Sequence, residues 1–472
     1  MFEPVIAPSG TLLGLLQRGR GDGTLHALTA PREQALAALN HCVRHDPRRD
    51  WQVENRSLYY ARLYLDLDGG LEEIEQHLFD AEDLLDEGEV RTGLALSVLG
   101  HLASYGRRDA LLLLRRYAAS GSNWAWALDE LALRDDDEGL RALAGPVLDR
   151  FPTDAEGNAS LAAAVGEAFE PRPWRLWADD PRPAIATRVR AAQEQASFDR
   201  WQRQLRAPGP RPSWGVAAVL DWAERGARRG VALHEPAARC LVAVAQPDDR
   251  GTIVEAARSG PDGARCAALR YLAGTHDPLA LDLIEQAAAG PCGTVADVAL
   301  SAFERMRSTA AVQRARRWAG RPDALGAAAG RMLACRGGAG DRDLVLGALR
   351  AAVRGGEHDP AVLSPLVDGA GRLGIECAAP VLRHVYRETA SSHLRGRTAR
   401  ALAATDVSFA TGFAVECLWD CEESTREVAA RYAETGDARV VERLRRLAAD
   451  PVEVDDVQLA VRSRIGAEHP PT

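Results

Sequence analysis

Residues 267–288 read AALRYLAGTHDPLALDLIEQAA: an Ala/Leu-rich run, a short turn with Asp277 and Pro278, and a second run with apolar residues three and four apart. This spacing predicts two amphipathic helices joined by a tight turn. The same arrangement recurs as AARYAETGDARVVERLRRLAA (429–449) and ARCLVAVAQPDDRGTIVEAAR (238–258). Looser copies follow Ser308, Gly340, Gly374 and Ala403. The C-terminal half is therefore expected to be an array of helical pairs.

Aspartates mark the turns of this array and recur at roughly one or two multiples of 30 residues. They are Asp249, Asp277, Asp341, Asp406 and Asp437. An Asp just before a helix accepts hydrogen bonds from the amides of the first turn. Small alanines let neighbouring helices approach, and one pair cannot bury its apolar stripe alone. We therefore expect an all-α fold without a sheet: an α-solenoid of stacked pairs with a concave binding surface.

These units resemble HEAT repeats, including those called phycobilin-lyase-like, in their helix lengths, turn Asp and alanine pattern. The resemblance covers about residues 230 to 450, and more weakly residues 89 to 170, as in GLALSVLGHLASYGRRDALLLLRRYA (93–118). It implies an architecture and no particular function.

The amino-acid composition of the chain changes between the two halves. Seven prolines fall between Pro171 and Pro212 and bracket one helical segment. Repeated prolines interrupt helices, so we place a junction here. The expected organisation is a more irregular helical N-terminal region (1–170) with degenerate HEAT-like repeats, a Pro/Trp/Arg-rich junction with one helix (171–214) and a HEAT-like repeat array (215–472).

Composition excludes several function classes. All 58 basic residues are arginine, so chemistry that depends on lysine, such as a P-loop or a Schiff base, is excluded. The formal charge of -9 gives no global reason to bind nucleic acid or an anionic membrane. No window predicts a membrane span or a leader, and we expect a cytoplasmic protein with reduced thiols.

The stretch SNWAWALDELA (122–132) places two indoles beside two carboxylates. On a helix Trp124 aligns with Leu128 in the core, whereas Trp126 aligns with Asp129 on another face. HEAT-like alkylpurine DNA glycosylases use aromatic residues and an aspartate around a damaged nucleotide, and Trp126 with Asp129 is similar in this respect. The competing interpretation is that Trp126 packs on the next repeat and Asp129 is solvated or paired with arginine.

Tryptophan and arginine are concentrated around the junction. Seven of the ten tryptophans lie between Trp124 and Trp222, and twelve Arg face seven Asp/Glu between Glu170 and Arg229. Together these side chains can stack on bases, hold phosphates or anchor a peptide, or they can staple an irregular junction. The candidate ligand- or partner-binding residues are Trp126, Trp174, Arg175, Trp177, Arg200, Trp201 and Arg203.

Two further patterns have a structural and a functional interpretation. Residues 71–90 hold nine acids and no arginine, which predicts a solvated acidic face or a binding surface for a basic protein. His41 and His45 have metal-ligand spacing on a helix, but no zincin Glu accompanies them, so we predict a helix terminus rather than a metal site.

The sequence thus predicts a non-enzymatic scaffold that binds a protein or peptide through its concave surface and the Trp/Arg-rich junction. No cofactor and no metal are expected, and net charge disfavours nucleic acid as a partner. The alternative is a nucleic-acid-binding enzyme resembling the alkylpurine glycosylases, in which Asp129 would be the catalytic residue.

Overall fold

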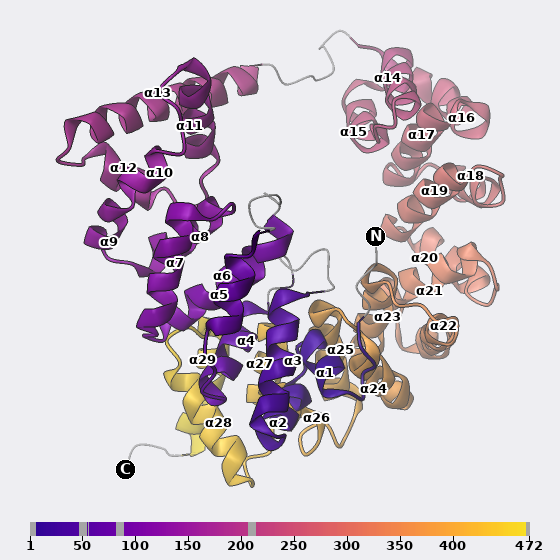
Figure 1. Cartoon of the computed structure of the whole chain (residues 1–472). Coiled ribbons are helices and arrows are strands. Elements are labelled where there is room, and N and C mark those ends of the chain that lie inside the picture. Colours follow the sequence, from indigo (N-terminus) through magenta and orange to yellow (C-terminus); the bar gives the residue numbers. More distant parts are fainter. Residues whose placement is uncertain (1–5, 47–53, 55, 82–88, 206–213, 469–472) are drawn as a thin grey trace. The chain divides into compact units, whose positions relative to one another are not determined.

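The computed structural model describes residues 6–46, 54, 56–81, 89–205 and 214–468; the side chains of residues 89, 90, 199–205 and 466–468 lie outside this description. The described chain is helical and contains no strand. It forms two compact units, of which unit 1 comprises residues 1–207, 387–399 and 407–472 and unit 2 comprises residues 208–386 and 400–406 (Figure 1). None of the described helices has the length and apolar character needed to cross a bilayer.

The helices of unit 1 are α1 (Leu12–Arg18), α2 (Gly21–Thr29), α3 (Arg32–Arg44), α4 (Ser57–Asp66), α5 (Glu72–Leu78), α6 (Glu89–Ser104), α7 (Arg108–Ser120), α8 (Trp124–Arg134), α9 (Asp137–Ala142), α10 (Ala144–Leu148), α11 (Ala155–Glu167), α12 (Arg172–Ala178), α13 (Pro183–Leu205), α26 (Phe413–Cys417), α27 (Glu423–Tyr432), α28 (Ala438–Ala449) and α29 (Asp455–Glu468). Those of unit 2 are α14 (Val216–Arg228), α15 (His234–Val244), α16 (Arg250–Ser259), α17 (Asp262–Gly274), α18 (Ala280–Ala288), α19 (Gly293–Arg305), α20 (Thr309–Trp318), α21 (Ala324–Arg336), α22 (Arg342–Arg354) and α23 (Pro360–Arg372). Two more, α24 (Ala379–Glu388) and α25 (Ser392–Thr405), contribute residues to both units.

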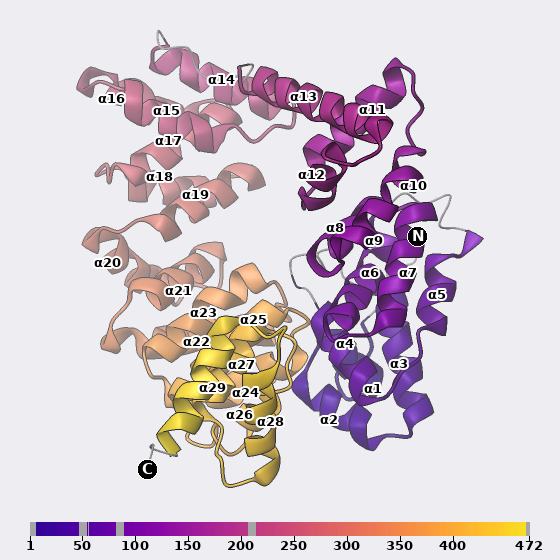
Figure 2. The same ribbon diagram turned by 90° about the vertical axis from the view of Figure 1, so that its left-hand side faces the viewer.

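Unit 2 is built from consecutive helices that alternate between two rows. Helices α15, α17, α19, α21 and α23 each contact the next member of their row, and Figure 2 shows α17, α19, α21 and α23 following one another along the unit. Helices α16, α18, α20 and α22 pack against this row from one side. Small residues allow the close spacing: Gly369 on α23 faces Ala334 on α21 with no room for a Cβ between them. Fully buried side chains such as Ile284 fill the layer between the rows.

Asp359 and Asp437 cap the helices that follow them, as the sequence pattern predicts. Asp277, Asp249 and Asp341 bond amides that lie before the first turn of α18, α16 and α22. Asp277, Asp359 and Asp437 each accept a hydrogen bond from the amide two residues later, at 2.8 to 2.9 Å. Asp249 and Asp341 instead accept from the amide three residues earlier, at 2.9 and 2.8 Å. In both arrangements the carboxylate holds an amide that the helix itself leaves without a partner.

In unit 1 the two ends of the described chain pack together. Figure 1 shows the C-terminal helices α28 and α29 (yellow) beside the N-terminal helices (indigo). The amide of Cys421 donates to the carbonyl of Gly19 at 2.9 Å, and Arg62 on α4 bonds the carboxylate of Asp450 at 2.7 Å. Gly19 has a φ of 67°, and its position against Cys421 leaves no room for a side chain. Residues far apart in the sequence therefore share one core.

This division does not coincide with the organisation expected at residues 170/171 and 214/215. The Pro-rich stretch up to residue 207 belongs to unit 1, and so do the helices from Val407 onwards. The pair at 429–449 has the sequence pattern of a repeat, and both of its helices contact α29, while α27 also contacts α26. Local periodicity reports a helical pair and says nothing of the neighbour against which the pair packs.

A bidentate arginine–carboxylate pair recurs in both units. In each pair Nε and Nη2 of the arginine donate to the two oxygens of an acid that lies 20 to 27 residues later. The pairs are Arg115–Asp135, Arg250–Asp277, Arg316–Asp341, Arg383–Asp406, Arg395–Asp420 and Arg426–Glu453. The acid is at most 8% exposed in every pair. We call these pairs the turn clamps.

Two turn clamps are buried on both sides. The side chains of Arg395 and Asp420 are each 0% exposed, and Arg426 and Glu453 are 2% and 0% exposed. Burial by itself would raise the pKa of Glu453, but the guanidinium of Arg426, helped by Arg62, lowers that pKa to about 2.

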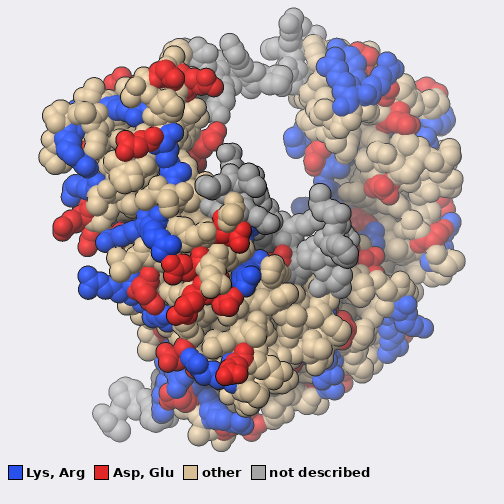
Figure 3. All heavy atoms as spheres, viewed as in Figure 1, with Lys and Arg blue, Asp and Glu red and all other residues tan. Residues whose placement is uncertain are grey.

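On the face shown in Figure 3, basic and acidic side chains lie intermixed over the surface of each unit.

Arg395→Lys is expected to lower the free energy of unfolding of unit 1 by about 3 kcal/mol, because an ammonium cannot make the two parallel hydrogen bonds that neutralise buried Asp420. The shift in the urea-unfolding midpoint measures this loss.

Arg446→Lys is the matched control, since Arg446 and Glu442 form a pair that is 65% and 54% exposed. Its expected effect is below about 0.5 kcal/mol. Equal effects of the two substitutions would contradict a special role of the turn clamps.

Candidate binding cavity at helix α8

A cavity of about 660 Å³ lies along helix α8 in unit 1. Residues of α6, α8, the end of α11, the loop that follows it and α12 line this cavity. Its size lies within the range of pockets that hold small ligands or single side chains of a partner. It is also where the sequence motif at 122–132 lies.

Three tryptophans form the wall of the cavity. The rings of Trp124 and Trp174 meet edge to face, with centroids 6.4 Å apart. Trp126 is partly buried, and its Nε1 donates to the hydroxyl of Ser97 at 3.0 Å. Fixed indoles of this kind present large apolar faces with little entropy left to lose on binding.

Four carboxylates lie around the same wall, and no arginine or histidine is among the lining residues. Glu130 is neutralised, because Arg134 bonds it at 2.6 Å and the Ser97 hydroxyl donates to it at 2.7 Å. Within the described chain no ion pair involves Asp129, Glu167 or Glu170. The cavity is therefore acidic.

Asp129 is the most perturbed of these groups. Its Oδ1 accepts a hydrogen bond from the amide of Glu170 at 3.0 Å. Burial nevertheless raises the pKa of Asp129 to about 6, and the neighbouring carboxylates of Glu170 and Glu130 add to the rise. A partly buried carboxyl with a raised pKa and no cation beside it is the feature expected of a site that meets its counter-charge in a ligand.

The structure places the other candidate residues differently. Trp177 is fully buried and donates to the carbonyl of Leu140 at 2.8 Å, so it holds α12 against α9 and does not reach the cavity. Arg175 is exposed and is not among the lining residues. The side chains of Arg200, Trp201 and Arg203 lie outside the described residues.

Trp124 and Trp126 are two positions apart and leave helix α8 on nearly opposite sides, yet both are among the residues that line the cavity. The lining runs along α8 from Asn123 to Leu133. Trp124 also packs in the core, edge to face on Phe151 at 5.7 Å.

The loop after α11 supplies residues that the sequence reading did not single out. Phe169 is 83% exposed at the rim of the cavity, and Leu133 on α8 is 60% exposed. Glu167 and Glu170 flank Phe169 in the sequence. The sequence signal that could have identified this loop is Phe169, a large aromatic residue between two acids and just before a proline-rich stretch.

Two arginines of the junction, Arg172 and Arg182, are bound to the protein itself. Arg172 donates to the carbonyls of Ala132 and Asp135 at 2.7 and 2.9 Å and pairs with Asp137. Arg182 donates to the carbonyl of Arg141 at 2.9 Å. These side chains fasten α12 and the start of α13 to α8 and α9 and are not available to a ligand.

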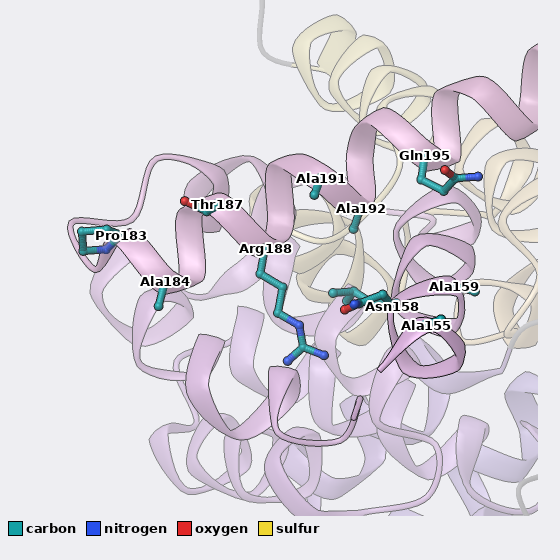
Figure 4. A pocket seen from close by; sticks show the side chains of 11 residues that line it. Ala155, Asn158, Ala159, Pro183, Ala184, Thr187, Arg188, Ala191, Ala192 and Gln195 are labelled. Carbon is teal, nitrogen blue, oxygen red and sulfur yellow. The ribbon is translucent and has the colours of Figure 1, made fainter. Parts of the chain in front are cut away.

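A second hollow, of about 860 Å³, lies between α11 and α13 (Figure 4). Its walls are mostly alanine, and its one charged lining residue is Arg188. The guanidinium of Arg188 donates to the carbonyls of Leu148 and Pro152 at 3.2 and 2.8 Å. Although this hollow is the larger, it offers a ligand little polar recognition.

His41 and His45 lie at the end of α3, with ring centroids 5.0 Å apart. Among the described residues, no group of three or more His, Cys, Asp or Glu side chains is arranged to hold a metal ion.

Comparison with protein-family models, with curated proteins and with solved structures finds no match to this chain.

Asp129→Asn is expected to raise the thermal unfolding temperature by about 2 °C at about pH 7.5, because it removes a desolvated carboxylate but keeps an oxygen that accepts from the amide of Glu170. The pKa of Asp129 is raised in the folded chain, so the wild type is penalised only as pH rises through about 6.

Below about pH 4 the difference between wild type and variant is therefore expected to vanish. Asp179→Asn is the control, because the Asp179 side chain is 86% exposed. This variant is expected to leave the unfolding temperature unchanged both at about pH 7.5 and below about pH 4. A variant less stable than the wild type at neutral pH would show that the Asp129 charge is compensated in the free protein.

Proposed function

We propose that this chain is a non-enzymatic binding protein, an α-solenoid of HEAT-like helical pairs, that captures a lysine or arginine side chain of a protein partner in the α8 cavity. One observation carries the proposal: the partly buried carboxyl of Asp129 lies in a cavity walled by tryptophan and has no cation among its described neighbours.

A cationic side chain complements each part of this cavity. An ammonium or guanidinium over an indole is attracted by about 0.5 to 2 kcal/mol, and a charge-assisted hydrogen bond to a carboxylate adds about 1.5 to 3 kcal/mol. The methylene stem of the side chain finds the partly buried indoles of Trp124 and Trp126, whereas Trp174, which is 2% exposed, supports Trp124 through its edge-to-face contact. The cation–indole attraction and the hydrogen bond add up to about 2 to 5 kcal/mol, which corresponds to an affinity around the millimolar range, so contacts with the residues beside the cation have to supply any tighter binding.

The occupant has to reach the cavity past Phe169 and Leu133, which are exposed at its rim. These apolar groups provide contact for residues on either side of the cation, which favours an extended peptide over a free small cation. Aromatic anchors surrounded by a polar rim are typical of protein interfaces. The chain contains no lysine, so a lysine occupant comes from another molecule.

The packing of unit 2 supports the solenoid part of the proposal. Its alternating rows of helices, each in contact with the next, are the arrangement that HEAT-like pairs adopt. Such a row presents one continuous surface along the array, which suits an elongated partner.

The nucleic-acid alternative retains one argument, because Trp126 and Asp129 border the same cavity. The charge of the cavity opposes it. Three carboxylates without a cation partner would repel the phosphates that flank a flipped nucleotide, and Arg172 and Arg182 are bound to backbone carbonyls. The glycosylase hypothesis predicts base release from alkylated DNA that is lost in Asp129→Asn.

Fluorescence anisotropy with labelled Gly/Ser peptides that carry one central lysine, arginine, trimethyllysine, glutamine or glutamate tests the proposal. The cationic peptides are expected to bind about tenfold more tightly than the glutamine peptide, and Asp129→Asn is expected to remove that preference. Because the ionised carboxyl is the binding form, affinity is expected to rise with pH through the pKa of about 6.

Trp126→Leu is expected to weaken cation binding, whereas Trp318→Leu, in the core of unit 2, serves as the matched control. Equal binding of the glutamate and lysine peptides would contradict the proposal. A single-stranded oligonucleotide that binds more tightly than every peptide would favour the nucleic-acid alternative.

A further inference from the structure

A cavity of about 410 Å³ with several charged lining residues lies in unit 2 on the row formed by α15, α17 and α19. Its lining carries four arginines, one histidine and a single carboxylate, that of Glu235. The arginines are Arg239, Arg270, Arg305 and Arg307. This charge is the opposite of that at the α8 cavity.

Glu235 acts as an internal counter-ion for this cluster. Its Oε1 accepts a hydrogen bond from Arg270 on α17 and another from Arg305 on α19, the latter at 3.1 Å. The Glu235 side chain is 48% exposed, whereas Arg270 is 13% exposed. The exposed carboxylate of Glu235 therefore lies over the largely buried side chain of Arg270. The Oε1 atom of Glu235 is shared between the donors of Arg270 and Arg305.

Two arginines of the cavity are not directly paired, although Arg270 lowers the pKa of Glu235 and the charge of Arg239 adds to that effect. No described residue forms an ion pair or a hydrogen bond with the guanidinium of Arg239 or of Arg307. The cluster thus holds more positive charge than Glu235 balances. Basic side chains gathered in a hollow concentrate anions there.

The next arginines along the row are held by the backbone. Arg336 donates to the carbonyl of Arg305 at 3.3 Å, and Arg372 donates to the carbonyl of Ala334 at 2.8 Å. These two guanidiniums keep their charge, but their hydrogen bonds hold them at helix ends outside the cavity. A nucleic-acid backbone needs a continuous track of cations, so a single compact anion fits the cavity better.

We propose that this cavity binds a phosphate monoester carried by a segment of a protein partner. A phosphoryl group brings about two negative charges and three acceptor oxygens, enough to engage Arg239, Arg270 and Arg305 at once while Glu235 swings into solvent. Val242, Tyr271 and Met306 offer apolar contact to the residues beside it. Arginine clusters recognise phosphorylated peptides in this way.

Titration of a labelled Gly/Ser heptapeptide with one central phosphoserine, and of its unphosphorylated form, tests the proposal on the full-length protein. The phosphorylated form is expected to bind about tenfold more tightly, and inorganic phosphate is expected to compete with it. Arg270→Gln is expected to reduce affinity about tenfold. Arg239→Gln, at an exposed residue without a partner, gives the same test where Arg270→Gln fails to fold.

Glu235→Gln distinguishes a binding site from a structural ion-pair cluster. If Glu235 competes with the ligand, this variant is expected to bind the phosphopeptide about threefold more tightly, a gain that no purely structural role produces. Arg225→Gln, which alters an exposed pair with Asp221 on α14 outside the cavity, is expected to leave binding unchanged.

Equal binding of both peptides, or weaker phosphopeptide binding by Glu235→Gln, would overturn the proposal. An oligonucleotide that binds more tightly than the phosphopeptide would overturn it as well. Asp129→Asn is expected to leave phosphopeptide binding unchanged, because Asp129 lies in unit 1 and Arg270 in unit 2. Failure of the phosphopeptide proposal would therefore not count against the cation-binding function proposed for the α8 cavity.

Discussion

A carboxylate buried in the turn between two helices has to be neutralised, and this requirement organises the whole chain. Each turn clamp meets it with an arginine supplied from 20 to 27 residues earlier, which fastens one helical pair to the next. The planar guanidinium donates two parallel hydrogen bonds, one to each carboxylate oxygen, which an ammonium cannot do. A chain whose basic residues are all arginine is well suited to this construction.

The two cavities show what happens where the pairing of charge is incomplete. At α8 the carboxyl of Asp129 is held by a backbone amide, and burial raises its pKa because no cation is near. At α15 to α19 one oxygen of Glu235 serves two arginines while two more have no partner. Many arginines elsewhere in the described residues meet an acid or a carbonyl, whereas each of these two cavities gathers charged groups whose pairing is incomplete, and such groups are where a ligand gains most.

The opposite charges of the cavities make them selective for different chemistry. The tryptophan wall and free carboxylates at α8 favour a cation, whereas the arginines at α17 favour a dianion. Both sites are built on helices, whose packing holds the groups before a ligand arrives. Such preorganisation lowers the entropy lost on binding.

The sequence by itself determined the helical pairs and their caps, because apolar spacing and a turn Asp such as Asp437 act over a few residues. It also pointed to Trp126 and Asp129. Only the tertiary structure decided that Trp177 is core, that both indoles of α8 reach one cavity, and that Arg270 meets Glu235. It also placed the helices after Val407 with the N-terminal ones. These outcomes depend on which faces meet across hundreds of residues, and a periodic pattern that fits many neighbours equally well cannot specify one of them.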